Sequence, residues 1–205
     1  NIYTNIDQAT NLVFSPSQTY FEIAVFLNPI AATDKDIVVR YISSNENADD
    51  ISLINLPNIL YSNSQQSENG DVTITKINDD GTWLIGVTLN NEVLAAEGLG
   101  SLSGTLQIIP NAWFVGEEIA SGYQNNIVSI TFNYADGSEE NPFWLQNAQD
   151  VIAIGTSRAA MEAHYRLETT IDMSAYASYL PLGKNLTSDG TVVAFSGSIV
   201  SESGD

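Results

Sequence analysis

Hydrophobic and polar residues alternate along most of the chain, and this pattern predicts β-strands with one buried face and one exposed face. In residues 20–27, for example, Phe21, Ile23 and Val25 are predicted on the opposite face from Tyr20 and Phe26. The stretches that alternate in this way are 20–27, 37–41, 72–75, 83–89, 128–134, 165–173 and 192–199. Trp83 lies inside one of them and is predicted to be a core residue.

Turn residues separate these stretches. Asn78 to Gly81 predicts a hairpin, and 135–138 and 188–190 predict further turns. Helix signals are few: 92–98 and 157–163 could each form a short helix, and no stripe of apolar residues extends over three turns. We therefore expect an all-β protein, a β-sandwich of immunoglobulin-like or jelly-roll type with at most one or two short helices.

The length of 205 residues suits a single large β-sandwich domain over 1–205. A weak boundary near Pro110 leaves a second option, with domains 1–110 and 111–205, because the aromatic density rises after this point.

Composition narrows the classes of function. The chain has 25 acidic and 6 basic residues, a net charge of −19, and only 15% charged residues. Scattered cations cannot form a basic surface, so we expect no nucleic-acid partner. No apolar run is long enough to span a bilayer, so no membrane insertion is expected. The amide-rich acidic surface and the start at Asn1 favour an extracellular, cell-surface or virion location.

Signals for catalysis are weak. The chain has no Cys and one His, and the G-x-S-x-G motif of serine hydrolases is absent. His164 could act as a general base, but a half-buried strand residue is the simpler interpretation. The paired carboxylates, such as Glu117 and Glu118, are neighbours in sequence and would point to opposite faces of a strand. We therefore expect a protein that is not an enzyme.

Aromatic residues are the candidates for binding or for a subunit interface. They could stack on sugar rings or bury surface between subunits, although ordinary core filling is also open. The candidates are Trp113, Phe114, Phe143, Trp144, Tyr176 and Tyr179.

No cofactor is expected apart from calcium, which binds six to eight oxygen ligands. Two turns rich in carboxylates are candidates. One contains Asp136 and Glu139, and the other contains Asp79 and Asp80. Neither turn has the spacing of an EF-hand loop.

These observations lead to three hypotheses. The first is a structural subunit of an extracellular assembly, such as a filament, pilus-like fibre or virion shell, which forms homo-oligomers or polymers by pairing strands or sheet edges. The second is a carbohydrate-binding or adhesin module that binds a glycan through exposed aromatics. The third, and least favoured, is a β-sandwich glycoside hydrolase, which would need two carboxylates roughly 5–10 Å apart in a cleft.

Overall fold

The computed structural model describes residues 1–8, 10–28, 33–45, 50–56, 60–62, 65–68, 70–97, 99, 102–176 and 192–201. The chain divides into two compact units, residues 1–134 and 135–205. Each unit has its own buried cluster of apolar side chains.

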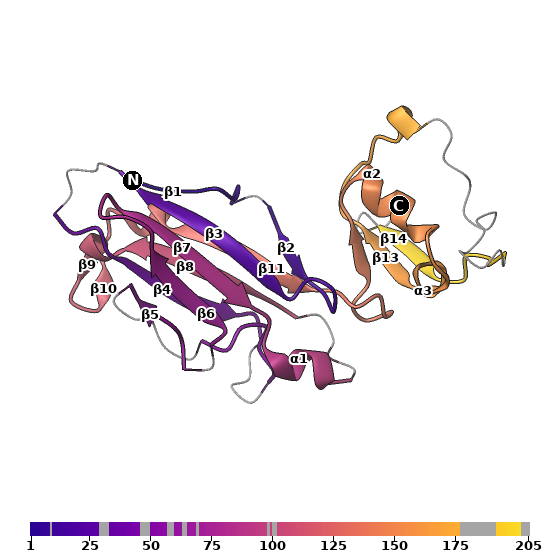
Figure 1. Cartoon of the computed structure of the whole chain (residues 1–205), viewed down its shortest axis with the longest axis horizontal. Helices are drawn as coiled ribbons and strands as arrows, with labels where there is room; N and C mark the ends of the chain where they lie inside the picture. Colours follow the sequence, from indigo (N-terminus) through magenta and orange to yellow (C-terminus); the bar gives the residue numbers. More distant parts are fainter. Residues whose placement is uncertain are drawn as a thin grey trace. The chain divides into compact units, whose positions relative to one another are not determined.

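The first sheet of unit 1 has four antiparallel strands in the order β1-β3-β7-β6 (Figure 1). The strands are β1 (Ile2–Thr4), β3 (Tyr20–Leu27), β7 (Thr82–Thr88) and β6 (Val72–Lys76). The predicted hairpin joins β6 to β7, where Gly81 has a φ of 97° and the Asn78 side chain accepts a hydrogen bond from the Thr82 N–H. β6 is the last strand in this order and therefore forms one edge of the sheet.

The second sheet of unit 1 has five strands in the order β2-β11-β8-β4-β5. The strands are β2 (Leu12–Phe14), β11 (Val128–Tyr134), β8 (Ser103–Pro110), β4 (Ile37–Ser43) and β5 (Leu60–Tyr61). β2 is parallel to β11, and the other pairs are antiparallel. The N-terminal stretch therefore supplies β1 to one sheet and β2 to the other.

One buried cluster holds the inward-facing residues of both sheets. Ile23 and Ile85 of the first sheet and Phe132 of the second are fully buried, as the alternation predicted. The Phe14 and Phe132 rings stack with their centroids 5.1 Å apart. Trp83 is only 3% exposed, which confirms its predicted place in the core.

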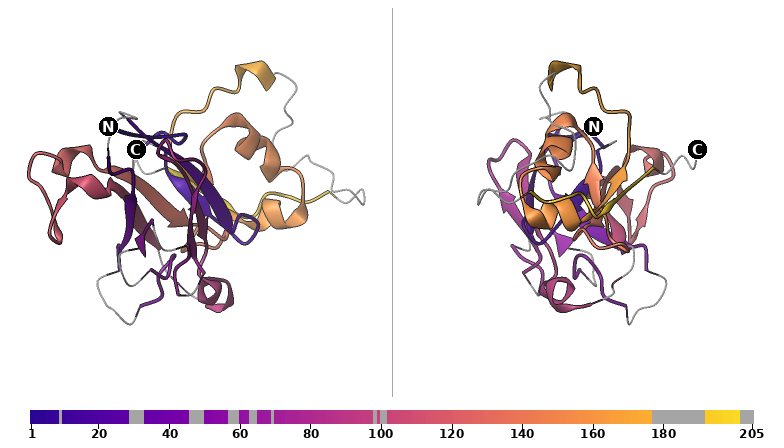
Figure 2. Two further views of the ribbon diagram at one scale, coloured as in Figure 1. Left: turned by 60° about the vertical axis from the view of Figure 1, so that its left-hand side comes forward. Right: turned by 90° about the vertical axis from the view of Figure 1, so that its right-hand side faces the viewer.

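Short elements complete unit 1. They are α1 (Asn91–Ala95), η1 (Asn111–Trp113), β9 (Phe114–Val115), β10 (Glu118–Ile119) and η2 (Gln124–Asn126). α1 lies beyond the ends of the strands, outside both sheets (Figures 1 and 2). β9 and β10 form a small antiparallel pair.

Unit 2 contains a parallel sheet in the order β12-β13-β14, whose strands are β12 (Phe143–Leu145), β13 (His164–Leu167) and β14 (Ser198–Ser201). Two helices, α2 (Ala148–Ile154) and α3 (Arg158–Glu162), connect β12 to β13, and η3 (Ser174–Tyr176) follows β13. Leu145, Ile154, Met161, Tyr165 and Val193 form the buried cluster of this unit.

The mostly-β class is confirmed, but the predicted number of helices is wrong. The described residues contain three α-helices. The predicted helices at 92–98 and 157–163 correspond to α1 and α3, whereas α2 was missed. α2 has seven residues and buries only Ile154, which is too short a segment to show a helical stripe.

The division considered near residue 110 falls inside unit 1, because β8, which precedes it, pairs with β11, which follows it. The boundary between the two compact units instead lies between residues 134 and 135. Whether the whole chain folds as one domain stays a prediction.

Candidate functional site

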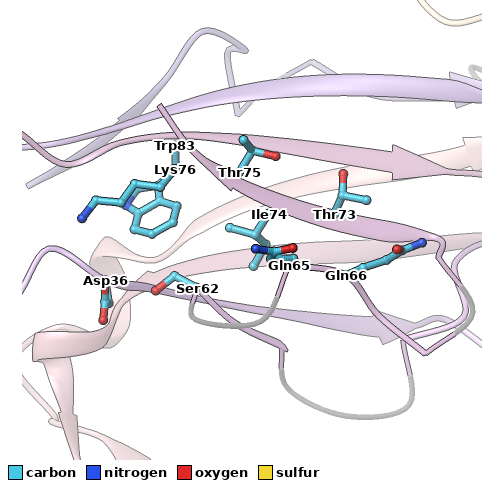
Figure 3. Close-up of a pocket in the computed structure, with 9 residues that line it drawn as sticks. All are labelled: Asp36, Ser62, Gln65, Gln66, Thr73, Ile74, Thr75, Lys76 and Trp83. Carbon is cyan, nitrogen blue, oxygen red and sulfur yellow. The ribbon is translucent and has the colours of Figure 1, made fainter. Parts of the chain in front are cut away.

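A pocket of about 750 Å³ lies beside the edge strand β6 of unit 1 (Figure 3). It is lined by β6 and Trp83 on one side and by Asp36, Ser62, Gln65 and Gln66 on the other. Asp36, Ser62, Lys76 and Trp83 lie toward one end of the pocket, and Gln66 and Thr73 lie toward the other.

Backbone pairing with β6 holds one wall of the pocket. The Ile74 N–H donates to the Gln65 carbonyl over 3.2 Å, and the Ser67 N–H donates to the Val72 carbonyl over 2.8 Å. An isolated bridge also joins Gln66 to Thr73. These bonds fix Gln65 and Gln66 next to the threonines of β6, so amide and hydroxyl side chains line the pocket together.

Three buried residues belong to the pocket wall. Ile74 and Trp83 are each 3% exposed, and the Trp83 indole N–H donates to the Lys35 carbonyl over 2.9 Å. This burial leaves no open ring face on which a ligand could stack. Ser62 is 8% exposed, and its Oγ has no hydrogen-bond partner among the described residues.

Asp36 and Lys76 line the charged end of the pocket, and Lys76 also contacts Asp79, which lies outside the lining. Lys76 Nζ lies 2.9 Å from Asp79 Oδ1 and 5.8 Å from the centroid of the Trp83 ring. Lys35 Nζ donates to the Asp79 carbonyl over 3.0 Å. The hydrogen bond with Asp79 raises the pKa of Lys76, and the same bond lowers the pKa of Asp79.

A second hollow of about 570 Å³ adjoins this charged end and shares Asp36 and Lys76 with the pocket. Asp34 also lines this hollow, and its Oδ2 accepts a hydrogen bond from Asn111 Nδ2 over 2.8 Å. Of the charged groups of this region, Lys76 and Asp79 pair with each other, whereas Lys35 and Asp34 bond to a backbone carbonyl and a side-chain amide.

The pocket offers mainly neutral hydrogen-bonding groups. Accessible hydroxyls come from Thr73 and Thr75, and amides come from Gln65 and Gln66. Hydroxyl and amide groups both donate and accept, so they match ligands that do the same. One carboxylate and one ammonium, from Asp36 and Lys76, add no net charge.

Two predicted aromatic candidates lie in unit 1. Trp113 is half-buried, packs against the core and stacks on Tyr123, with ring centroids 4.9 Å apart and an angle of 7°. Its neighbour Phe114 is also half-buried and begins β9. Tyr123 and the core therefore cover much of the Trp113 ring.

Three others lie in unit 2. Phe143 packs against the buried cluster of that unit. The Arg166 guanidinium lies 5.1 Å from the centroid of the Trp144 ring, and Gln149 Nε2 donates to Tyr176 Oη over 2.7 Å. Tyr179 lies outside the described residues. The candidates are thus divided between the units, and their role in binding or in an interface stays a prediction.

The predicted calcium ligands also lie in both units. Asp79 pairs with Lys76, and Asp80 Oδ1 accepts from the Thr82 hydroxyl over 2.8 Å. In unit 2, Asp136 Oδ1 accepts from the Ser138 N–H, and Glu139 is exposed. No three His, Cys, Asp or Glu side chains of the described chain gather around one point that could hold a metal ion. Calcium binding at these turns stays a prediction.

His164 lies half-buried at the start of β13, where its Nδ1 is 2.8 Å from Ser198 Oγ of β14. The two residues face each other in the parallel pairing of β13 with β14. This contact bridges two neighbouring strands.

Exposed aromatics on the outer face of the first sheet were missed. Tyr3, Tyr20 and Phe26 are 51%, 46% and 44% exposed. The signal was present in the sequence, because Tyr20 and Phe26 occupy the face of β3 opposite its buried residues. Aromatic rings on a predicted solvent face are an exception to the usual burial of large apolar side chains, and such exceptions mark candidate binding surfaces.

Comparison with known proteins gives no family. No family model matches the chain, and no curated protein matches it. The E. coli chaperone DraB aligns at 14% identity over 65% of this chain and 53% of that chain, with a TM-score of 0.28. The YadV chaperone aligns at 10% identity over 69% of this chain and 55% of that chain, with a TM-score of 0.30. The chain thus spans just over half the length of each.

The prediction of a self-associating structural subunit is contradicted, because the two solved structures named above are chaperones and not filament subunits. TM-scores this low give no argument for a chaperone's activity in this chain. No helix of the described part is long and apolar enough to cross a membrane.

Proposed function

We propose that the chain is a non-catalytic binding module whose pocket beside β6 takes a neutral, hydroxyl-rich ligand of the carbohydrate class. The observation that supports this most is the lining of the pocket, where hydroxyl and amide side chains outnumber charged ones. Sugars present hydroxyls that donate and accept hydrogen bonds, as these side chains do.

Charge supports a neutral ligand. The chain has a net charge of −19, so an anionic ligand would be repelled at long range. Asp36 and Lys76 bear opposite charges and offer no excess of either sign to an ion. A neutral glycan is not repelled by the net charge and does not need an excess of charge in the pocket.

Binding is favoured over hydrolysis by the carboxylates. Glycoside hydrolysis uses two carboxyl groups, one of them an acid with a raised pKa. Among the described residues that line the pocket, Asp36 is the sole carboxylate. Asp79 of the adjoining hollow has a lowered pKa, which is the wrong direction for a general acid.

We also propose that unit 1 is an immunoglobulin-like sandwich and not a jelly roll. The strand orders β1-β3-β7-β6 and β11-β8-β4-β5 correspond to the orders A-B-E-D and G-F-C-C′ of that pattern. This assignment places the pocket between the D and C′ edges.

The test is binding of the full chain to neutral polysaccharides, by affinity electrophoresis and then by calorimetry with oligosaccharides. Gln65→Ala and Thr75→Val should each weaken binding about 2–10-fold, because each removes one or two hydrogen bonds. Thr131→Val, on β11 of the other sheet, is the matched control and should bind as the wild type does. Incubation with the ligand should release no new reducing ends. If no neutral polysaccharide retards the wild type, or if Thr131→Val weakens binding as much, the proposal is wrong.

A further inference from the structure

Tyr20 lies on the outer face of the first sheet, next to the pocket. It begins β3 and is 46% exposed, although it is a large aromatic residue. Its Oη lies 3.4 Å from Glu22 Oε2 on the same face of the strand. Burial and the Glu22 carboxylate both raise the pKa of Tyr20.

Gly86 of β7 makes room for this ring. A Cβ at position 86 would lie 2.7 Å from Tyr20 Oη and 3.1 Å from Tyr20 Cε2. The ring therefore occupies the space that a side chain at residue 86 would take. Gly86 does not have a positive φ, so the glycine is explained by this space and not by the backbone conformation.

The same position connects the ring to the pocket. The Cβ site of Gly86 lies 2.6 Å from Thr73 Oγ1, and Thr73 lines the pocket. Thr73 and Gly86 are also partners in the pairing of β6 with β7. The Tyr20 ring and the hydroxyl-lined pocket are thus adjacent, with Thr73 between them.

We propose that Tyr20 forms a second subsite, on which one sugar ring stacks while another sits in the pocket. The ligand is then an oligosaccharide of at least two rings that crosses β6 toward β7. An aromatic ring with one side held against a sheet offers its other side to the apolar C–H groups of a sugar at little entropic cost. This inference rests on the proposed function and specifies the length and course of the ligand.

The test compares oligosaccharides of increasing length, prepared from the polysaccharide that binds, by calorimetry with the full chain. For the wild type, affinity should rise about 10-fold from one ring to two or three. Tyr20→Ala should abolish this rise and leave the affinity for a single ring unchanged. Tyr20→Phe keeps the ring and should retain most of the rise.

Two further variants separate stacking from folding. Gly86→Ala keeps Tyr20 but displaces its ring, so it should also reduce the rise with length. Tyr123→Ala removes a tyrosine of similar exposure, 42%, which stacks on Trp113 and not on the first sheet, and it should leave the rise with length unchanged. Circular dichroism checks that each variant folds. If Gly86→Ala does not fold, the comparison of Tyr20→Ala with Tyr20→Phe still tests the subsite.

The outcomes separate this inference from the proposed function. If Tyr20→Ala keeps the rise with length while Gln65→Ala weakens binding, the subsite is wrong and the pocket stands. If Tyr20→Ala weakens all lengths equally, the ring supports the pocket and is not a second subsite. If the wild type binds no neutral glycan, both proposals fall.

Discussion

Ser62 places a hydroxyl in the wall of the pocket where no described residue bonds to it. A buried hydroxyl without a partner destabilises a fold, and its removal is neutral or favourable. We therefore expect Ser62→Ala to leave the free energy of unfolding unchanged or to raise it by up to about 1 kcal/mol, measured by urea denaturation.

Ser62→Ala should leave glycan binding close to that of the wild type, because Ser62 Oγ is buried in the pocket wall and is not accessible to a ligand. A loss of stability above about 1 kcal/mol would contradict the expectation, since it would show that Ser62 Oγ has a partner in the free protein.

Asp71 is a buried carboxyl whose side chain accepts a hydrogen bond from the Asn55 N–H over 2.9 Å. Burial raises its pKa above 3.8, and the Asn55 bond offsets this only in part. The folded state thus binds the proton more tightly than the unfolded state, and stability falls as the pH rises from 3.8 through the raised pKa.

Asp71→Asn keeps an acceptor for Asn55 and removes the buried charge. We expect the variant to be more stable than the wild type at neutral pH, with the difference disappearing below pH 3.8, in urea denaturation across the pH range. Asp172→Asn is a control of opposite sign, because the Ser174 N–H lowers the pKa of the Asp172 carboxyl. A gain for Asp71→Asn that did not change with pH would contradict the charge explanation.

For single residues, the sequence predicted which side chains are buried better than it predicted which side chains line the pocket. Trp83 follows from alternation alone, because its place on the inner face is fixed by the period of the strand. Ser62 and Gln65 gave no signal, because their proximity to Thr73 depends on how the chain after β5 returns to β6. Contacts of that kind are not encoded in local periodicity.

Gly197 controls how closely β14 approaches the end of α3. A Cβ at this position would lie 1.8 Å from the Ala163 carbonyl oxygen, a backbone atom that cannot move aside by itself. We expect Gly197→Ala to destabilise unit 2 by about 1–3 kcal/mol and to increase hydrogen exchange in β13 and β14.

Gly122→Ala is the control for glycine replacement as such, because a Cβ there meets no atom within 4 Å. It should be neutral or slightly stabilising. Equal effects of the two replacements would show that close approach is not the reason for glycine at residue 197.

Strands were predicted well where they alternate in both sheets of unit 1, and less well in unit 2. In the predicted strand 165–173, only the residues up to Leu167 form a strand. In the predicted strand 192–199, only the residues from Ser198 onward do. Ile171 and Phe195 still pack on the buried cluster, although they lie outside the sheet. The spacing of apolar residues therefore correctly indicated that Ile171 and Phe195 pack on the core, but the backbone at both residues is irregular and not a strand.

At the scale of the whole molecule, the boundary at 134/135 was not predicted, because residues 128–138 have the pattern of one more strand followed by a turn. What marks the boundary is a change in pairing: strands in unit 1 are mainly antiparallel, and those in unit 2 are parallel. Neighbouring residues do not report the direction of the partner strand, so this change is invisible to a pattern of period two.

The charge of the whole molecule gives a final prediction. A net charge of −19 on 205 residues means that carboxylates repel one another across the folded surface. Raising NaCl from about 0.01 M to about 1 M shortens the Debye length from roughly 30 Å to roughly 3 Å and should raise Tm, measured by differential scanning calorimetry. A variant with the exposed residues Glu117, Glu139 and Glu140 changed to Gln has less repulsion to screen, so salt should raise its Tm by less. A Tm that falls with salt in the wild type would instead mean that attractive ion pairs, such as that of Lys76 with Asp79, outweigh the repulsion.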